Sequence, residues 1–221
     1  MPRLLSVVLV LTSLFGGALV ATDAAAASPS DTTARRNVRA QDFPTQADAA
    51  NIYNYLENGD RSGRDQRVLR LRAGDCVRPR VVARARSGRL MDYDPPTGER
   101  PRRDDPQALT LAFNRTREAR SAMTRFRRIA ARCAGRSSAG GTTVRLRRFP
   151  TDSVAERKAV SFRTRVTGRG RDTRLVTVIS RSDNSIMMTQ VRNDQKGPRR
   201  IKAQRFHDRQ VETRLVRSSS R

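Results

Sequence analysis

The sequence predicts an α+β fold in which helices pack on one face of an antiparallel sheet of four to five strands. Three observations predict it. The longest stretch without Pro or Gly, 107–133, repeats its apolar residues every three to four positions, which is the period of a helix. Several other segments alternate apolar and basic residues, which is the period of a half-buried strand. These strands follow one another with short connections, which argues against regularly alternating parallel units.

The 107–133 segment predicts a long amphipathic helix. Its apolar side consists of Ala112, Ala119, Ala122, Met123, Phe126, Ile129, Ala130 and Cys133. Its other side carries Arg117, Arg120, Arg125, Arg127, Arg128 and Arg132. We expect the apolar side to be buried and the cationic side to face solvent.

The rest of the chain predicts shorter elements, each bounded by turn-forming residues. In order, these are a helix over 46–58, a strand over 67–73, a proline-rich surface excursion over 78–106 with one short strand at 81–82, a flexible connection over 135–141, strands over 143–149 and 158–166, a hairpin of 174–181 with 186–192, and a helix over 199–216. The strands carry Arg on one side and Val, Leu or Phe on the other. One sheet face should therefore meet the helices and the other should meet solvent.

Residues 1–27 have the three-part pattern of a secretory signal peptide: an early cation at Arg3, an apolar run over 4–20, and small residues before Ser28. A membrane anchor is the alternative, but the run is short for a stable span. We therefore expect a secreted, extracellular product, exported by a cleavable signal peptide and left without a transmembrane anchor.

The mature chain is predicted to have one domain. Residues 28–42 are small, polar and charged, which is typical of a disordered linker. A single domain over 43–217 and a frayed tail over 218–221 follow. Cys76 and Cys133 are the only cysteines, and two cysteines in an exported chain fit one disulfide. Two buried free thiols are the alternative.

The charge is strongly positive: 46 Lys and Arg against 21 Asp and Glu give +25. Such a field attracts acidic cell-envelope polymers, anionic lipid headgroups or nucleic acid without choosing among them. Aromatic residues make up 5% of the chain and Trp is absent, so recognition of single strands by base stacking is poorly supported. A coding bias towards arginine is an alternative source of the same charge.

The basic residues of the predicted strands form the strongest candidate site. If the strands pair as expected, one outward sheet face carries Arg70, Arg72, Arg145, Arg147, Arg163 and Arg165. Guanidinium groups can bind phosphates or carboxylates in pairs, so we predict that this face binds an anionic ligand. A solvated face with incidental arginines is the alternative.

Several of these features together resemble a family. The alanine-rich helix ending in Cys133, the segment PTDSVAERKAVSFR and the hairpin VTVISRSDNSIMMTQV are similar to the extracellular sensor domain of actinobacterial PknH-type serine/threonine kinases. The hairpin turn Arg181-Ser182-Asp183-Asn184 is similar to the R-x-x-N turn of that family. The resemblance implies an α+β fold, a sensing or binding role, and a disulfide that joins Cys133 to an upstream cysteine. The family's second disulfide has no counterpart here.

Enzymatic chemistry has few candidates. His207 is the only histidine, and we expect it to be a solvated surface residue of the last helix. Neither a cofactor nor a metal is expected, because one His and two Cys do not build a multi-His or multi-Cys site. Asp92 with Asp94 and Asp104 with Asp105 are paired carboxylates, whose expected role is local charge balance. The leading hypothesis is a non-enzymatic, sensor-like ligand-binding domain that contacts an anionic cell-envelope component. The alternative is an exported hydrolase of a polyanion such as RNA that uses His207 and these carboxylates.

Overall fold

The structure, a computed structural model, describes residues 37–73, 78–96, 105–139, 141–149, 159–168, 171–193 and 198–219. The helical elements are η1 (Ala40–Asp42), α2 (Gln46–Ile52), η2 (Asn54–Leu56), α3 (Thr116–Arg132) and α4 (Arg200–Ser219). The strands are β1 (Asp60–Asp65), β2 (Val68–Ala73), β3 (Arg78–Arg84), β4 (Ser87–Asp94), β5 (Asp105–Ala112), β6 (Gly135–Ala139), β7 (Thr142–Phe149), β8 (Val160–Gly168), β9 (Arg171–Ser182) and β10 (Ser185–Arg192). The predicted signal peptide lies outside the described residues.

Eight strands form one antiparallel sheet in the order β1-β4-β5-β10-β9-β8-β7-β6, and β2 pairs with β3 in a separate hairpin. The α+β class and the antiparallel sheet are confirmed, but the prediction of four to five strands was too low. Strands β1, β4, β5 and β6 were missed. In β4, Leu90 and Met91 are neighbours that are both buried, on opposite faces, so the strand does not show a clean alternation.

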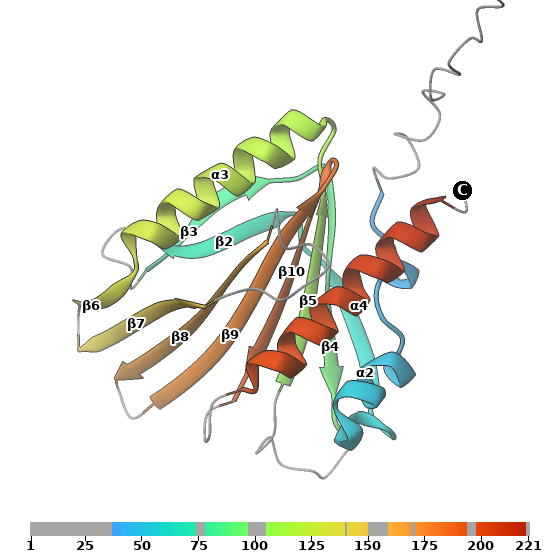
Figure 1. Ribbon diagram of the computed structural model, residues 1–221, viewed down its shortest axis with the longest axis horizontal. Coiled ribbons are helices and arrows are strands. Elements are labelled where there is room, and N and C mark those ends of the chain that lie inside the picture. The colour runs from blue at the N-terminus through green and yellow to red at the C-terminus, as the bar shows by residue number, and fades with distance from the viewer. Residues whose placement is uncertain are drawn as a thin grey trace, which may run out of the picture.

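The helices cover both faces of the sheet, so the prediction that they share one face was wrong. Helix α3 packs with the β2–β3 hairpin on one face, and α4 packs with α2 on the other (Figure 1). The reason lies in the central strands. On β9, Val176 and Val178 face α4 while Ile179 faces α3, and both sides are fully buried. A strand buried on both sides has apolar residues at successive positions.

Each face has its own apolar core. Beneath α3, the rings of Phe126 and Phe162 lie 5.7 Å apart. Beneath α4, Phe206 contacts Tyr93 edge-on at 5.0 Å and Tyr53 at 6.0 Å. Edge-on ring pairs contribute roughly 0.5–1.5 kcal/mol beyond the burial of their area. The two helices are therefore held on the sheet independently.

The long helix begins later than the sequence predicts. Residues 107–112 belong to β5, and α3 begins at Thr116. At this boundary the carboxylate of Glu118 accepts a hydrogen bond from the Asn114 backbone amide at 3.2 Å. The β9–β10 turn lies alongside: the Asn184 side chain donates to the Phe113 carbonyl at 2.8 Å. The turn of the R-x-x-N pattern thus fixes the chain where it enters α3.

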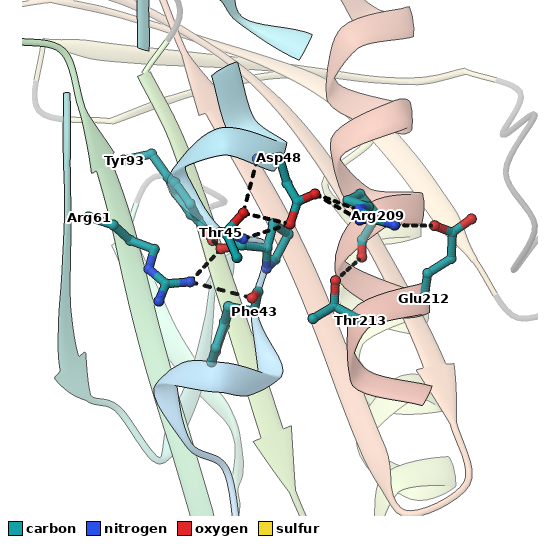
Figure 2. A network of polar contacts seen from close by, with 9 residues as sticks. Phe43, Thr45, Asp48, Arg61, Tyr93, Arg209, Glu212 and Thr213 are labelled. Atoms are coloured by element: carbon teal, nitrogen blue, oxygen red, sulfur yellow. Dashed lines mark hydrogen bonds and ion pairs between the residues drawn. The ribbon is translucent and has the colours of Figure 1, made fainter. Parts of the chain in front are cut away.

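The N-terminal segment is tied to α4. Asp48 accepts hydrogen bonds from the Arg209 guanidinium at 2.7 and 3.0 Å, and Thr45 caps α2 (Figure 2). Burial opposes the charge on Asp48, but the Thr45 amide and the Arg209 guanidinium outweigh it and lower the pKa of this carboxyl. On the other side, Tyr93 donates to the Pro44 carbonyl at 2.8 Å. These contacts seat α2 between α4 and β4.

The end of the predicted linker 28–42 is structured, because residues 40–42 form η1. Its Asp42 is 2% exposed at the side chain and forms an ion pair with Arg214 of α4, which is 5% exposed. The guanidinium of Arg214 also donates to the Asn37 carbonyl at 3.3 Å. At the other end, α4 extends to Ser219, into the predicted frayed tail.

Cys133 follows α3 and is 3% exposed. It is disulfide-bonded, and the described residues contain no free cysteine. Cys76 lies outside the described residues, so the pairing of Cys76 with Cys133 stays a prediction. None of the described helices combines the length and the apolar character that crossing a bilayer requires.

His207 is fully buried, so the prediction of a solvated histidine was wrong. Its Nε2 lies 2.9 Å from Ser180 Oγ and its Nδ1 lies 3.2 Å from Thr189 Oγ1. Next to it, Gln210 donates to the Leu109 carbonyl at 3.0 Å and accepts from Thr189 at 2.9 Å. These side chains join α4 to β5, β9 and β10. Burial lowers the pKa of His207 to about 3, so the imidazole is neutral.

The Asp42–Arg214 pair provides the first test of this architecture. We expect Arg214→Met to lower the free energy of unfolding by about 3–5 kcal/mol, because it leaves the Asp42 carboxylate buried without its cation. Urea unfolding measures the change. The double variant Arg214→Met/Asp42→Asn should recover part of the loss, and no recovery would show that the ion pair is not the cause.

The buried imidazole predicts how stability depends on pH. The unfolded chain binds a proton at His207 below about pH 6.5, whereas the folded chain does not bind one until about pH 3. Unfolding free energy should therefore decrease as the pH falls from 6 to 4, by up to roughly 1.4 kcal/mol per pH unit from this group. His207→Gln should have a shallower slope in the same range. Equal slopes would contradict the buried neutral state.

Candidate functional site

Four of the six predicted arginines come together on one sheet face. Arg145 of β7 is directly opposite Arg165 of β8, and Arg147 is directly opposite Arg163. Their neighbours along the strands, such as Leu146 and Phe162, point to the α3 face. The arginines therefore lie on the α4 face. Helix α4 packs on β5, β9 and β10, and none of the described helices packs on β7 and β8 on this face (Figure 1).

Two arginines that the sequence analysis missed extend this cluster across four strands. Arg136 of β6 pairs with Arg145, and Arg174 of β9 pairs with Arg165. We call the resulting set the arginine ladder: Arg136, Arg145, Arg147, Arg163, Arg165 and Arg174. The strand registers needed to find it were not available from the sequence, and β6 was interpreted as a flexible connection.

One carboxylate sits at the end of the arginine ladder. Asp172 accepts hydrogen bonds from Arg165 at 2.9 and 2.7 Å and from Arg174 at 3.0 Å. The Arg165 hydrogen bond, with Arg174 and against a small effect of burial, lowers the pKa of Asp172 to about 2. The other four ladder arginines are exposed and form no hydrogen bond or ion pair with any described residue.

The remaining predicted residues, Arg70 and Arg72, do not share this face. Both belong to β2, which lies in the separate hairpin over the α3 face. The side chain of Arg72 is outside the described part of the structure. Arg70 is exposed and lines a cavity between the α3 layer and the main sheet. The predicted six-residue face is therefore divided between two places.

This α3 cavity has a volume of about 220 Å³. Its walls are largely apolar and come from α3 and from β5, β7, β8, β9 and β10: Leu109, Phe126, Val144, Leu146, Phe162, Leu175 and Met188, with Cys133. Apolar walls with a few polar groups are typical of small-molecule sites.

The polar groups of the α3 cavity come from both layers. Gln66 and Arg70 contribute from the hairpin side, and Thr164, Thr177 and Gln190 contribute from the sheet. Gln190 donates to Thr177 Oγ1 at 3.3 Å across β9 and β10. Arg70 is the only charged residue among the lining residues, and it has no ion pair within the described structure. The cavity can therefore receive an apolar body together with a polar or anionic group.

The candidate catalytic residues that the structure describes do not meet. His207 is buried between α4, to which it belongs, and the sheet. Asp104 lies outside the described residues. Asp92 forms an ion pair with Arg64 of β1 at 2.5 Å. Burial, with Asp92 and Asp60 nearby, raises the pKa of Asp94. The described residues contain no group of three or more His, Cys, Asp or Glu side chains that could hold a metal ion.

Comparison with known proteins identifies the fold. No protein-family model matches the chain, and no curated protein matches it by sequence. Among solved structures, it is similar to the extracellular domain of PknH from Mycobacterium tuberculosis. The TM-score is 0.52, and the match covers 82% of this chain and 99% of that chain. The resemblance seen in the sequence is thus confirmed for the fold. At 9% identity, the likeness to the PknH domain extends to the fold alone.

The Asp172 contacts can be tested directly. We expect the Asp172 carboxyl to titrate near pH 2, well below the usual 3.9 of an aspartate, when it is followed by carbon NMR. Arg165→Gln should raise this pKa towards the usual value, because it removes the strongest hydrogen bond to the charged form. Arg148→Gln, which changes an exposed arginine of β7 on the other face, is the matched control and should leave it unchanged. An unaltered pKa in Arg165→Gln would refute the pairing.

Proposed function

We propose that the chain is an exported, non-enzymatic sensor-like domain that binds a small ligand with an apolar body and an anionic end in the α3 cavity. The cavity carries the proposal. It lies between the layer formed by α3 with the β2–β3 hairpin and the layer formed by the main sheet, so an occupant would contact both layers. The predicted signal peptide would bring the domain to the cell envelope. Its ligand therefore belongs among the anionic components found there.

The size of the α3 cavity limits the ligand. Its volume of about 220 Å³ is roughly seven times the ~30 Å³ that one water molecule occupies in the liquid. A chain of six to ten non-hydrogen atoms is therefore the expected size of the buried part. A larger molecule would leave its remainder outside the cavity, and Arg70 is the exposed lining residue that could contact it.

The charge of the α3 cavity sets the type of end group. Arg70 is the only ionised group among the lining residues, and no carboxylate lines the cavity. A carboxylate or phosphate on the ligand would gain a charge-assisted hydrogen bond from this guanidinium. Thr164 and Thr177, at 7% and 3% exposure, offer hydroxyl groups deeper in the sheet. An anionic amphiphile fits these groups better than a cation or a purely apolar molecule does.

The alternative of a hydrolase receives less support. General acid-base catalysis requires a side chain within hydrogen-bond reach of the substrate. His207 is 0% exposed, and both of its ring nitrogens have partners inside the protein. Its neutral state and its contacts explain its presence as a link between α4 and the sheet. We therefore propose a binding function.

A series of straight-chain carboxylates tests the proposal. Each buried methylene contributes about 0.8 kcal/mol, so affinity should rise about four-fold per added carbon and then level off near eight to ten carbons. Isothermal titration calorimetry with the full chain measures this series. Leu175→Phe should shorten the chain at which affinity levels off, because the larger ring fills part of the α3 cavity, whereas the volume-conserving Leu175→Met should not.

Arg70→Gln tests the anionic end in the same series. It should weaken carboxylate binding roughly ten-fold while leaving the dependence on chain length unchanged. Arg67→Gln is the matched control, because Arg67 is equally exposed but does not line the cavity. Carboxylates that bind the Leu175→Phe and wild-type chains identically at every length would refute the cavity as the binding site.

A further inference from the structure

The arginine ladder places like charges directly opposite one another, which a sheet normally avoids. Arg136, Arg145, Arg165 and Arg174 occupy equivalent positions on four successive strands, and Arg147 and Arg163 form a second row two residues away. Like charges at directly opposite positions destabilise an antiparallel pair. Asp172 balances only one of the six charges. The arrangement therefore acts against local stability, which points to a role in binding.

We propose that the arginine ladder binds a linear phosphodiester chain that lies across β6 to β9. Adjacent strands are about 4.8 Å apart, so the four-arginine row extends over roughly 14 Å, and the second row lies about 7 Å from it along the strands. This is a flat, elongated cationic patch on the side of the sheet opposite the α3 cavity. The forked guanidinium groups match phosphate oxygens, and neighbouring forks can share one phosphate.

The exposure of the ladder favours a polymer over a small anion. Arg136, Arg145, Arg147 and Arg163 are all exposed, and single exposed ion contacts contribute little. Several contacts along one chain add up, because each neutralised phosphate releases counterions and each further contact forms intramolecularly. The described exposed large hydrophobic residues are Val81, Ile201, Leu215 and Val216, and all lie outside β6 to β9. The described side chains of β6 to β9 therefore provide no exposed apolar anchor beside the ladder, which disfavours insertion into a membrane surface.

The proposal requires only the charge and spacing of the phosphates, which two sources can supply. One is a poly(polyol phosphate) of the cell envelope, and the other is single-stranded nucleic acid. Phe149, two residues after Arg147 on β7, is the one aromatic residue at a ladder-face position of β6 to β9, and its side chain lies outside the described part of the structure. One ring does not provide the row of stacking platforms that single-strand binding uses, so backbone charge is what both polymers offer to this face. We expect poly(glycerol phosphate) and oligothymidylate to bind through backbone charge in the same way.

The test compares two variants that remove the same number of charges. In the ladder variant, Arg136, Arg145, Arg147 and Arg163 are all changed to Gln. In the control variant, four exposed arginines of α3 are changed to Gln: Arg117, Arg120, Arg127 and Arg128. Fluorescence anisotropy with labelled poly(glycerol phosphate) and oligothymidylate should show affinity for the wild-type chain that falls with salt, with a log-log slope of about −3 for four phosphate contacts.

We expect the ladder variant to lose roughly 100-fold or more in affinity at 0.1 M salt, and the control variant to lose less than about three-fold. The thermal midpoint of the ladder variant should not be lower than that of the wild type, since the change removes repulsion. Binding of either polymer with this difference between the variants supports the proposal, and the ratio of the two affinities shows which of the two sources binds better.

Three results would overturn it. Equal losses in the two variants would show that bulk charge alone attracts the polymer. Binding of inorganic phosphate as tightly as either polymer would point to a small-anion site. Ladder-dependent binding to phosphatidylglycerol vesicles, with neither polymer bound, would assign the face to a membrane. The carboxylate series at the α3 cavity is independent of all three results, so the two proposals can fail separately.

Discussion

Burial of β9 and β10 on both faces fixes the positions of the other elements. The apolar residues of these strands alternate between the α3 core and the α4 core, so each helix has one face on which it can pack. Towards β6 none of the described helices covers the α4 face, and arginine replaces valine at the positions that face the same side. In the part of the chain that the structure describes, the sheet is therefore covered on both faces at its centre and on one face at the β6 end.

Much of this could be predicted from periodicity. The structure confirms the elements whose apolar residues fit only one period. These are β7, β8 and the β9–β10 hairpin, which alternate as strands do, and α3, whose apolar residues recur every three to four positions. The missed strands lack such a pattern. β6 has the sequence GRSSA, with no apolar alternation, and is held by pairing with β7 at the sheet edge. β5 could be interpreted as the beginning of a helix, because QALTLA fits both periods, and its pairing with β4 and β10 decides the outcome.

For the candidate sites too, the sequence predicts features within one element but not the pairing between elements. The outward position of Arg145, Arg147, Arg163 and Arg165 follows from alternation within each strand, so the sequence could predict it. Which strands are neighbours is decided by long-range pairing, so Arg136 and Arg174 were not found and Arg70 was placed on the wrong face. His207 was misjudged because its neighbours in the sequence are charged, whereas its partners Ser180 and Thr189 come from β9 and β10. The α3 cavity requires two layers to be placed before it can be seen.

The contact between Asp42 and Arg214 brings the start of the described chain beside the last turns of α4. The first described residues and the last turns of α4 therefore lie at one corner of the domain, and β6 to β8 lie at the opposite end of the sheet (Figure 1). An attachment through either segment would therefore hold the domain at this corner. The strands β6 to β8 would then lie farthest from the attachment point, at a distance set by the width of the sheet.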